Sequence, residues 1–141
     1  VYRPSPEVER ALEAEFKSFR EVLSEADIIT IHVPLTPKTR HMIGREELAL
    51  MKPNAVIVNT SRGAVIDTKA LLEALKGGKL LGACLDVFEH EPPSEPWELE
   101  LVKLPNVVAT PHIGAMTVEA QRAAAVILAN KIIDYFKRKT L

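Results

Sequence analysis

Short apolar runs alternate with amphipathic stretches along the chain, and this alternation predicts an α/β fold. The runs are rich in valine and isoleucine, as buried strands are. The stretches between them place apolar residues three and four positions apart, the spacing of one helix face. Because parallel strands need long crossover connections, the alternation predicts a doubly wound, Rossmann-like parallel sheet. The predicted strands are 27–33, 55–59, 80–87 and 106–110, and the predicted helices are 7–15, 18–24, 45–51, 68–76 and 117–138.

Local signals define some of these elements more closely. Asp67 can cap the helix over 68–76, and Gly77-Gly78 can supply the positive φ at which that helix ends. The strand over 27–33 is rich in β-branched residues and is ended by a proline, which predicts a sheet covered on both faces. The proline-rich stretch 91–96 is expected to be a surface loop.

Composition places the chain among globular proteins of ordinary size. Its 141 residues are 47% hydrophobic and 26% charged, which excludes a disordered tail, a collagen-like repeat and a disulfide scaffold. Lys and Arg number 18 against 19 Asp and Glu, so no electrostatic footprint for nucleic acid or an anionic membrane is present. The single cysteine, Cys84, is expected in the core, and we expect a reducing, cytoplasmic location.

Candidate chemistry collects where the predicted strands end, because open parallel sheets bind ligands beyond their carboxyl ends. Arg62 follows one strand and offers a planar fork that matches a carboxylate. His112 follows the last strand and can give or take a proton near neutral pH. A nearby carboxylate such as Glu91 would favour the imidazolium. These groups predict a site for a small carboxylate whose neighbouring atom gains or loses a proton.

Four strings of residues closely resemble those of the D-isomer-specific 2-hydroxyacid dehydrogenase family, in the same order and at the same spacing. They are His-Val-Pro-Leu-Thr-Pro-Lys-Thr at 32–39, Asn-Thr-Ser-Arg-Gly-Ala at 59–64, Leu-Asp-Val-Phe-Glu-His-Glu-Pro-Pro at 85–93 and Thr-Pro-His-Ile-Gly-Ala at 110–115. The similarity is to enzymes of the phosphoglycerate dehydrogenase and glyoxylate/hydroxypyruvate reductase type. It implies hydride transfer between NAD(P) and a D-2-hydroxy acid or 2-oxo acid.

The resemblance also implies a role for each matching residue. Arg62 would bind the substrate carboxylate, His112 would act as the acid/base, and Glu91 would support His112. NAD is the implied cofactor; NADP is the alternative, for which Arg3 could meet a 2′-phosphate. No metal is implied. The implied cofactor contacts are Val33, Pro34, Thr60, Ser61, Arg62, Asp86, His112, Ile113, Gly114 and Ala115.

The family's glycine-rich, pyrophosphate-binding loop has no match in this sequence, since all six glycines lie elsewhere. By resemblance we therefore expect residues 1–115 to form the distal part of a dinucleotide-binding domain that lacks its first βαβ unit. Residues 116–141 would form the helix that returns to the substrate domain. Without the glycine loop, these residues alone are expected to bind dinucleotide weakly and to be inactive.

Several alternatives stay open at this point. The substrate could be 3-phosphoglycerate, or glyoxylate and hydroxypyruvate, and the protein could instead be a dehydrogenase-like regulatory or corepressor module. For Asp86 the alternative is a structural role in a turn. His32, His41 and His90 are not expected to be catalytic. The expected partners are a small 2-hydroxy or 2-oxo acid and, by resemblance, a second copy in a homodimer, with neither nucleic acid nor membrane.

Overall fold

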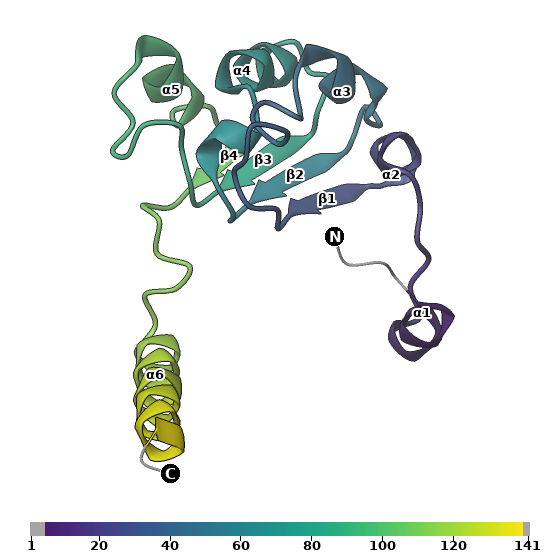
Figure 1. Cartoon of the computed structure of the whole chain (residues 1–141). Helices are drawn as coiled ribbons and strands as arrows, with labels where there is room; N and C mark the ends of the chain where they lie inside the picture. Colours follow the sequence, from purple (N-terminus) through teal and green to yellow (C-terminus); the bar gives the residue numbers. More distant parts are fainter. Residues whose placement is uncertain (1–4, 140–141) are drawn as a thin grey trace.

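The computed structural model describes residues 5–139, and within them it shows a four-stranded parallel sheet (Figure 1). The strands lie side by side in chain order, and every neighbouring pair is parallel. The predicted parallel α/β sheet is confirmed, and the carboxyl ends of its strands meet at one edge. The strands are β1 (Ile28–Ile31), β2 (Val56–Asn59), β3 (Gly82–Leu85) and β4 (Val107–Ala109).

The helices largely follow the predicted ranges. The Asp67 side chain accepts a hydrogen bond from the Ala70 amide at 3.1 Å and caps α4, as predicted. The positive φ after this helix, 68°, belongs to Gly78 and not to Gly77. Helix α5 was not predicted. The helices are α1 (Pro6–Leu12), α2 (Phe19–Glu25), α3 (Arg45–Leu50), the 3-10 turn η1 (Gly63–Val65), α4 (Thr68–Lys76), α5 (Pro96–Leu101) and α6 (Val118–Lys139).

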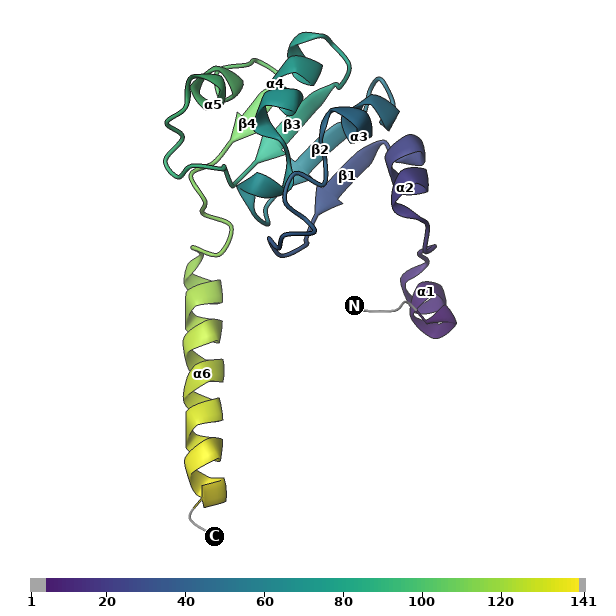
Figure 2. The ribbon, with the colours of Figure 1, turned by 45° about the horizontal axis from the view of Figure 1, so that its top comes forward.

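The core lies between the sheet and the row of helices α2 to α5, which pack each against the next. Alternate strand residues such as Ile29 and Ile57 point into it and are buried. The opposite face carries Val108, which is 62% exposed, and Cys84, which is only partly buried. The expectation of cover on both faces is therefore wrong for the described residues, because α3, α4 and α5 lie on one face (Figures 1 and 2). For the same reason Cys84 lies outside the core.

Helix α6 extends away from this body (Figures 1 and 2). Its apolar side chains, among them Val126, Ile132 and Phe136, are about half exposed or more. The rings of Tyr135 and Phe136 meet edge to face, with centroids 5.5 Å apart. Within residues 5–139, no helix has both the length and the apolar character that crossing a bilayer requires.

Candidate functional site

The turn that follows β2 presents Arg62 at the carboxyl edge of the sheet, and Asn59 builds this turn. Asn59 is buried, and its side-chain oxygen accepts hydrogen bonds from the amide and hydroxyl of Ser61 at 3.0 and 2.9 Å. Its side-chain nitrogen donates to the Arg62 carbonyl at 3.0 Å. Sequence reasoning gave Asn59 no role, although a buried amide at the end of an apolar strand is a signal for such a turn.

The Arg62 side chain itself lies at the surface. Its Nη1 donates to the Ser61 carbonyl at 2.6 Å, and among the described residues its guanidinium makes no other hydrogen bond or ion pair. Most donors of the fork therefore face solvent. A planar guanidinium in this state can accept a carboxylate with two parallel hydrogen bonds.

His112 and Glu91 form the ion pair that the sequence predicted. The Nδ1 of His112 lies 2.7 Å from Oε2 of Glu91, and Oε1 of Glu91 accepts from the Phe88 amide at 3.1 Å. Burial raises the pKa of Glu91, but hydrogen bonds from His112 and Phe88 and the charges of His112 and Arg62 outweigh it, so the net shift is downward. With Nδ1–H donated to a carboxylate, Nε2 is the ring nitrogen left to exchange a proton.

Asp86 holds the turn that carries His112. Residue 112 has a φ of 55°, in the left-handed region that few non-glycine residues adopt. The amides of Ile113 and Gly114 donate to the two Asp86 oxygens at 2.9 and 2.8 Å, and the Thr110 hydroxyl donates at 2.5 Å. The Thr110 bond is the main cause that lowers the pKa of Asp86. These contacts agree with the alternative in which Asp86 has a structural role in a turn.

Glu98 organises the chain that follows Glu91. This glutamate of α5 is fully buried, and its carboxylate accepts from the amides of His90, Ser94 and Glu95 at 3.0, 3.2 and 3.2 Å. Burial raises its pKa, but the hydrogen bonds from these amides and from the His90 side chain outweigh this effect, so the net shift is downward. Sequence reasoning missed it; the signal was an acidic residue three positions after Glu95, the spacing of a capping box.

A hollow of about 560 Å³ lies beside Arg62, at the carboxyl ends of β1 and β2. Apart from His32, its wall is apolar on the β1 side, and it is polar on the β2 side. Four residues predicted to contact the cofactor without a catalytic role line it. The lining is His32, Val33, Pro34, Leu35, Thr60, Ser61 and Arg62.

Other predicted cofactor residues lie elsewhere. Asp86, Ile113, Gly114 and Ala115 do not line this hollow. A smaller hollow of about 260 Å³ borders Glu91 and His112 and is otherwise lined by Phe88, Pro92, Pro93 and Pro111. Arg3, which could meet the 2′-phosphate of NADP, lies outside the described residues.

The remaining histidines have other partners. His32 bonds the Thr30 hydroxyl at 2.9 Å, and His90 bonds Glu98 at 3.1 Å.

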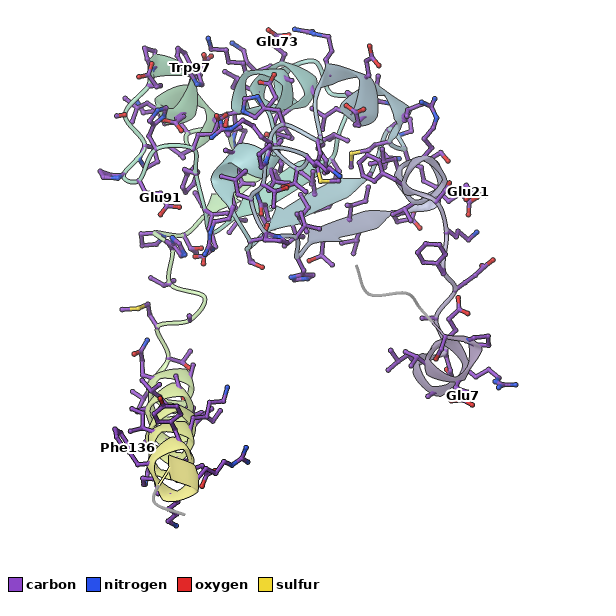
Figure 3. All side chains as sticks on the ribbon, viewed as in Figure 1. Glu7, Glu21, Glu73, Glu91, Trp97 and Phe136 are labelled. Carbon is purple, nitrogen blue, oxygen red and sulfur yellow. The ribbon has the colours of Figure 1, made fainter. Side chains whose placement is uncertain are left out.

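Figure 3 shows Glu91 at the edge of the body from which the chain runs to α6. The arrangement thus combines an open guanidinium with an imidazole whose second nitrogen is free to act, so it can bind an anion and move a proton.

Comparison with known proteins places the chain beside enzymes of one kind. Residues 1–114 match the family described as D-isomer specific 2-hydroxyacid dehydrogenase, NAD binding domain. A glyoxylate reductase from Thermococcus litoralis is 53% identical over 132 residues, which are 94% of this chain and 39% of the relative. A D-3-phosphoglycerate dehydrogenase from Methanocaldococcus jannaschii is 61% identical over 112 residues, 79% of this chain and 21% of the relative.

Solved structures agree with the sequence comparison. The NAD-complexed form of a D-isomer specific 2-hydroxyacid dehydrogenase from Lactobacillus delbrueckii ssp. bulgaricus superposes with a TM-score of 0.84 at 35% identity. The superposition covers 96% of this chain and 44% of that structure. The chain therefore spans less than half of the length of these relatives.

Proposed function

Because the chain belongs to the D-isomer-specific 2-hydroxyacid dehydrogenase family, we propose that it supplies the cofactor-side half of an NAD-dependent enzyme that interconverts 2-oxo acids and D-2-hydroxy acids. The observation that carries the proposal is the 2.7 Å pair of His112 with Glu91, next to the open guanidinium of Arg62. The charge of Arg62 helps to lower the pKa of Glu91, which supports the proposal that the two loops serve one site.

His112 is the proposed acid/base. In the reductive direction its Nε2–H donates a proton to the oxygen on C2 of the 2-oxo acid, and in the oxidative direction Nε2 takes that proton back. Nδ1 stays bonded to Glu91 throughout. Because Glu91 has a lowered pKa, it is ionised at neutral pH and compensates the charge of the imidazolium.

Arg62 is proposed to bind the substrate carboxylate through its exposed fork. This contact orients the substrate and brings positive charge close to the C2 oxygen, where negative charge develops as the carbonyl carbon is reduced and before His112 supplies the proton. Val33, Pro34, Thr60 and Ser61 would hold the nicotinamide end of the cofactor in the 560 Å³ hollow. The chemistry that NADH supplies when bound there is hydride transfer to the substrate carbon.

Other expectations stay predictions. Cofactor contacts by Asp86, Ile113, Gly114 and Ala115, a return of residues 116–141 to a substrate domain, and a homodimer rest on the family resemblance. The relatives named above are a glyoxylate reductase and a phosphoglycerate dehydrogenase, so we propose a small 2-oxo acid as the substrate class.

The test is the oxidation of NADH by the full-length protein that carries this sequence, followed by the absorbance of NADH. Glyoxylate, hydroxypyruvate, 3-phosphohydroxypyruvate and pyruvate are compared with methyl pyruvate, which lacks the carboxylate. We expect at least one 2-oxo acid to be reduced and the ester to be a much poorer substrate. Absence of turnover with every acid, or equal turnover of pyruvate and its ester, would contradict the proposal.

A further inference from the structure

Glu89 lies two residues before Glu91, but its carboxylate contacts a different part of the protein. One oxygen accepts from the amide and the hydroxyl of Thr68 at 3.1 and 2.6 Å. The other oxygen lies 2.9 Å from Nε2 of His41. The Glu89 side chain is only 17% exposed, so these contacts are partly shielded from water. One acidic side chain therefore joins three segments that are far apart in the sequence.

The start of α4 is a favourable place for this carboxylate. Thr68 is the first residue of the helix, whose free N–H groups and dipole attract negative charge. Burial raises the pKa of Glu89, but the hydrogen bonds from Thr68 and His41 lower it by more. Glu89 is thus held in its ionised form at the helix terminus.

The same cluster reaches the turn of Arg62. Gly63 follows Arg62, and a Cβ atom at Gly63 would lie 1.9 Å from the carbonyl carbon of Phe88. The backbone before Glu89 is therefore pressed against the backbone after Arg62, and only glycine fits there. On the other side, the His41 amide donates to the Ala64 carbonyl at 2.8 Å. The Glu89 contacts hold both of these segments in place.

The two glutamates that follow Phe88, at positions 89 and 91, thus point to two sites. Glu89 binds α4 and His41, whereas Glu91 binds His112. Because the Phe88 amide also donates to Glu91, any shift of Phe88 away from Gly63 changes the position of the Glu91 carboxylate. This short stretch of chain therefore connects the backbone beside Arg62 with the carboxylate that binds His112.

We propose that Glu89 is a positioning residue, which clamps the loop of Glu91 onto the segment of Arg62 and so fixes the acid/base pair relative to the carboxylate-binding fork. The proposal deepens the proposed function and rests on it for its kinetic consequence. Displacement of a reacting group by an ångström can cost a large factor in rate, so loss of the clamp is expected to lower kcat and to leave cofactor affinity largely unchanged.

The experiment compares three variants of the full-length protein. Glu89→Ala removes the clamp and is expected to lower kcat roughly tenfold. Glu89→Gln is expected to restore most of this activity, because its amide oxygen can accept from Thr68 while its amide nitrogen faces His41. The matched control is Glu73→Ala, which removes a glutamate that belongs to α4 and pairs at the surface with Arg45. The control is expected to keep wild-type kcat.

A second readout does not depend on turnover. With histidine labelled by ¹⁵N, the Nδ1–H proton of His112 is observed by NMR in the wild type, Glu89→Ala and a Glu91→Gln reference. We expect Glu89→Ala to broaden this signal through exchange with water. The signal tests the clamp even if no 2-oxo acid is reduced, so failure of the proposed function is distinguished from failure of the clamp.

An unchanged His112 signal in Glu89→Ala would overturn the proposal, whether or not kcat or the unfolding temperature falls. Equal kcat in Glu89→Ala and the wild type would overturn it as well. If Glu89→Ala does not fold, His41→Ala removes one arm of the clamp and leaves Thr68 in place. That variant is expected to show a smaller change of the His112 signal in the same direction, and no change would again contradict the clamp.

Discussion

Arg62 and His112 stand at one edge of the sheet, on the loops that follow β2 and β4, yet the protein holds their side chains in different ways. The His112 ring is bonded to Glu91, and the turn beneath it is bonded through Asp86. Asn59 fixes the backbone of Arg62, but the guanidinium has only the carbonyl of Ser61 as a partner within the described residues. The His112 side chain is therefore already oriented by the protein, whereas for Arg62 only the backbone is fixed and most of the guanidinium is free.

This difference follows from the work that each group is proposed to do. A proton donor must be oriented before the reaction, so the imidazole is anchored through the nitrogen that does not react. A carboxylate-binding fork gains its partners from the substrate, and donors already engaged with the protein would have to be freed first. The comparison therefore predicts that damage to the His112 half acts on proton transfer, and damage to the Arg62 half acts on substrate binding.

The largest expected effect is that of His112→Ala. Removal of a general acid/base typically costs between a hundredfold and ten thousandfold, and we expect kcat to fall about a thousandfold. His90→Gln is the control, because His90 also pairs with a glutamate but does not border the hollows described above. Steady-state kinetics with NADH and the best 2-oxo acid measure the change. Similar kcat values in the two variants would remove the acid/base assignment.

Arg62→Ala is expected to lower kcat/KM for the 2-oxo acid about a hundredfold. Arg62→Lys should recover only part of this, because an ammonium lacks the planar fork. Added guanidinium in the assay is expected to restore some activity to the alanine variant. If the loss in Arg62→Ala were the same for pyruvate and for methyl pyruvate, carboxylate binding by Arg62 would be contradicted.

Glu98→Ala tests the support behind Glu91 at the level of stability. The variant leaves the amides of His90, Ser94 and Glu95 without their acceptor, and we expect the free energy of unfolding to fall by about 2 kcal/mol. The control is Glu100→Ala. Glu100 lies on α5 like Glu98, but it is exposed and pairs with Lys76 of α4, so its removal should lower the free energy of unfolding by less than about 0.5 kcal/mol. Urea unfolding measures both. Equal losses would show that the buried carboxylate does not organise the loop.

The smallest expected effect is the pH-dependent contribution of Asp86 to stability. Its pKa is lowered in the folded protein from an ordinary value of 3.8, so its ionised form stabilises the fold above that pH. The contribution is lost as pH falls below 3.8 and through the folded-state pKa. We expect Asp86→Asn to be less stable than the wild type at neutral pH and the difference to shrink in acid. A difference that is constant down to pH 2 would contradict this role.

Much of the scaffold could be predicted from the sequence. The alternation of apolar runs and amphipathic stretches was sufficient for the parallel sheet, and α4 was predicted with both its ends, because Asp67 and the glycines after it give local signals. The pairing of His112 with Glu91 was also predicted, but from the resemblance of the motifs. Spacing along the chain alone does not show that residues 21 positions apart will meet.

The missed features depend on long-range contacts. Helix α5 is short and begins at the end of the proline-rich stretch 91–96, which was expected to be a loop, so its buried Glu98 had no context in the sequence. The bonds of Asp86 to residues 113 and 114, and those of Glu89 to Thr68 and His41, join segments more than 20 positions apart. The packing of the chain after β3 decides which loop each carboxylate contacts. Composition does not predict this packing.

The most direct test of the two-part site is a crystal structure of the full-length protein with NADH and oxamate, an unreactive analogue of a 2-oxo acid. We predict that the Arg62 guanidinium leaves the Ser61 carbonyl and forms two hydrogen bonds with the oxamate carboxylate. The distance from His112 Nδ1 to Glu91 is predicted to stay near 2.7 Å, with Nε2 facing the ligand's C2 oxygen. A carboxylate bound away from Arg62, or a His112 ring that turns away from Glu91, would contradict the account.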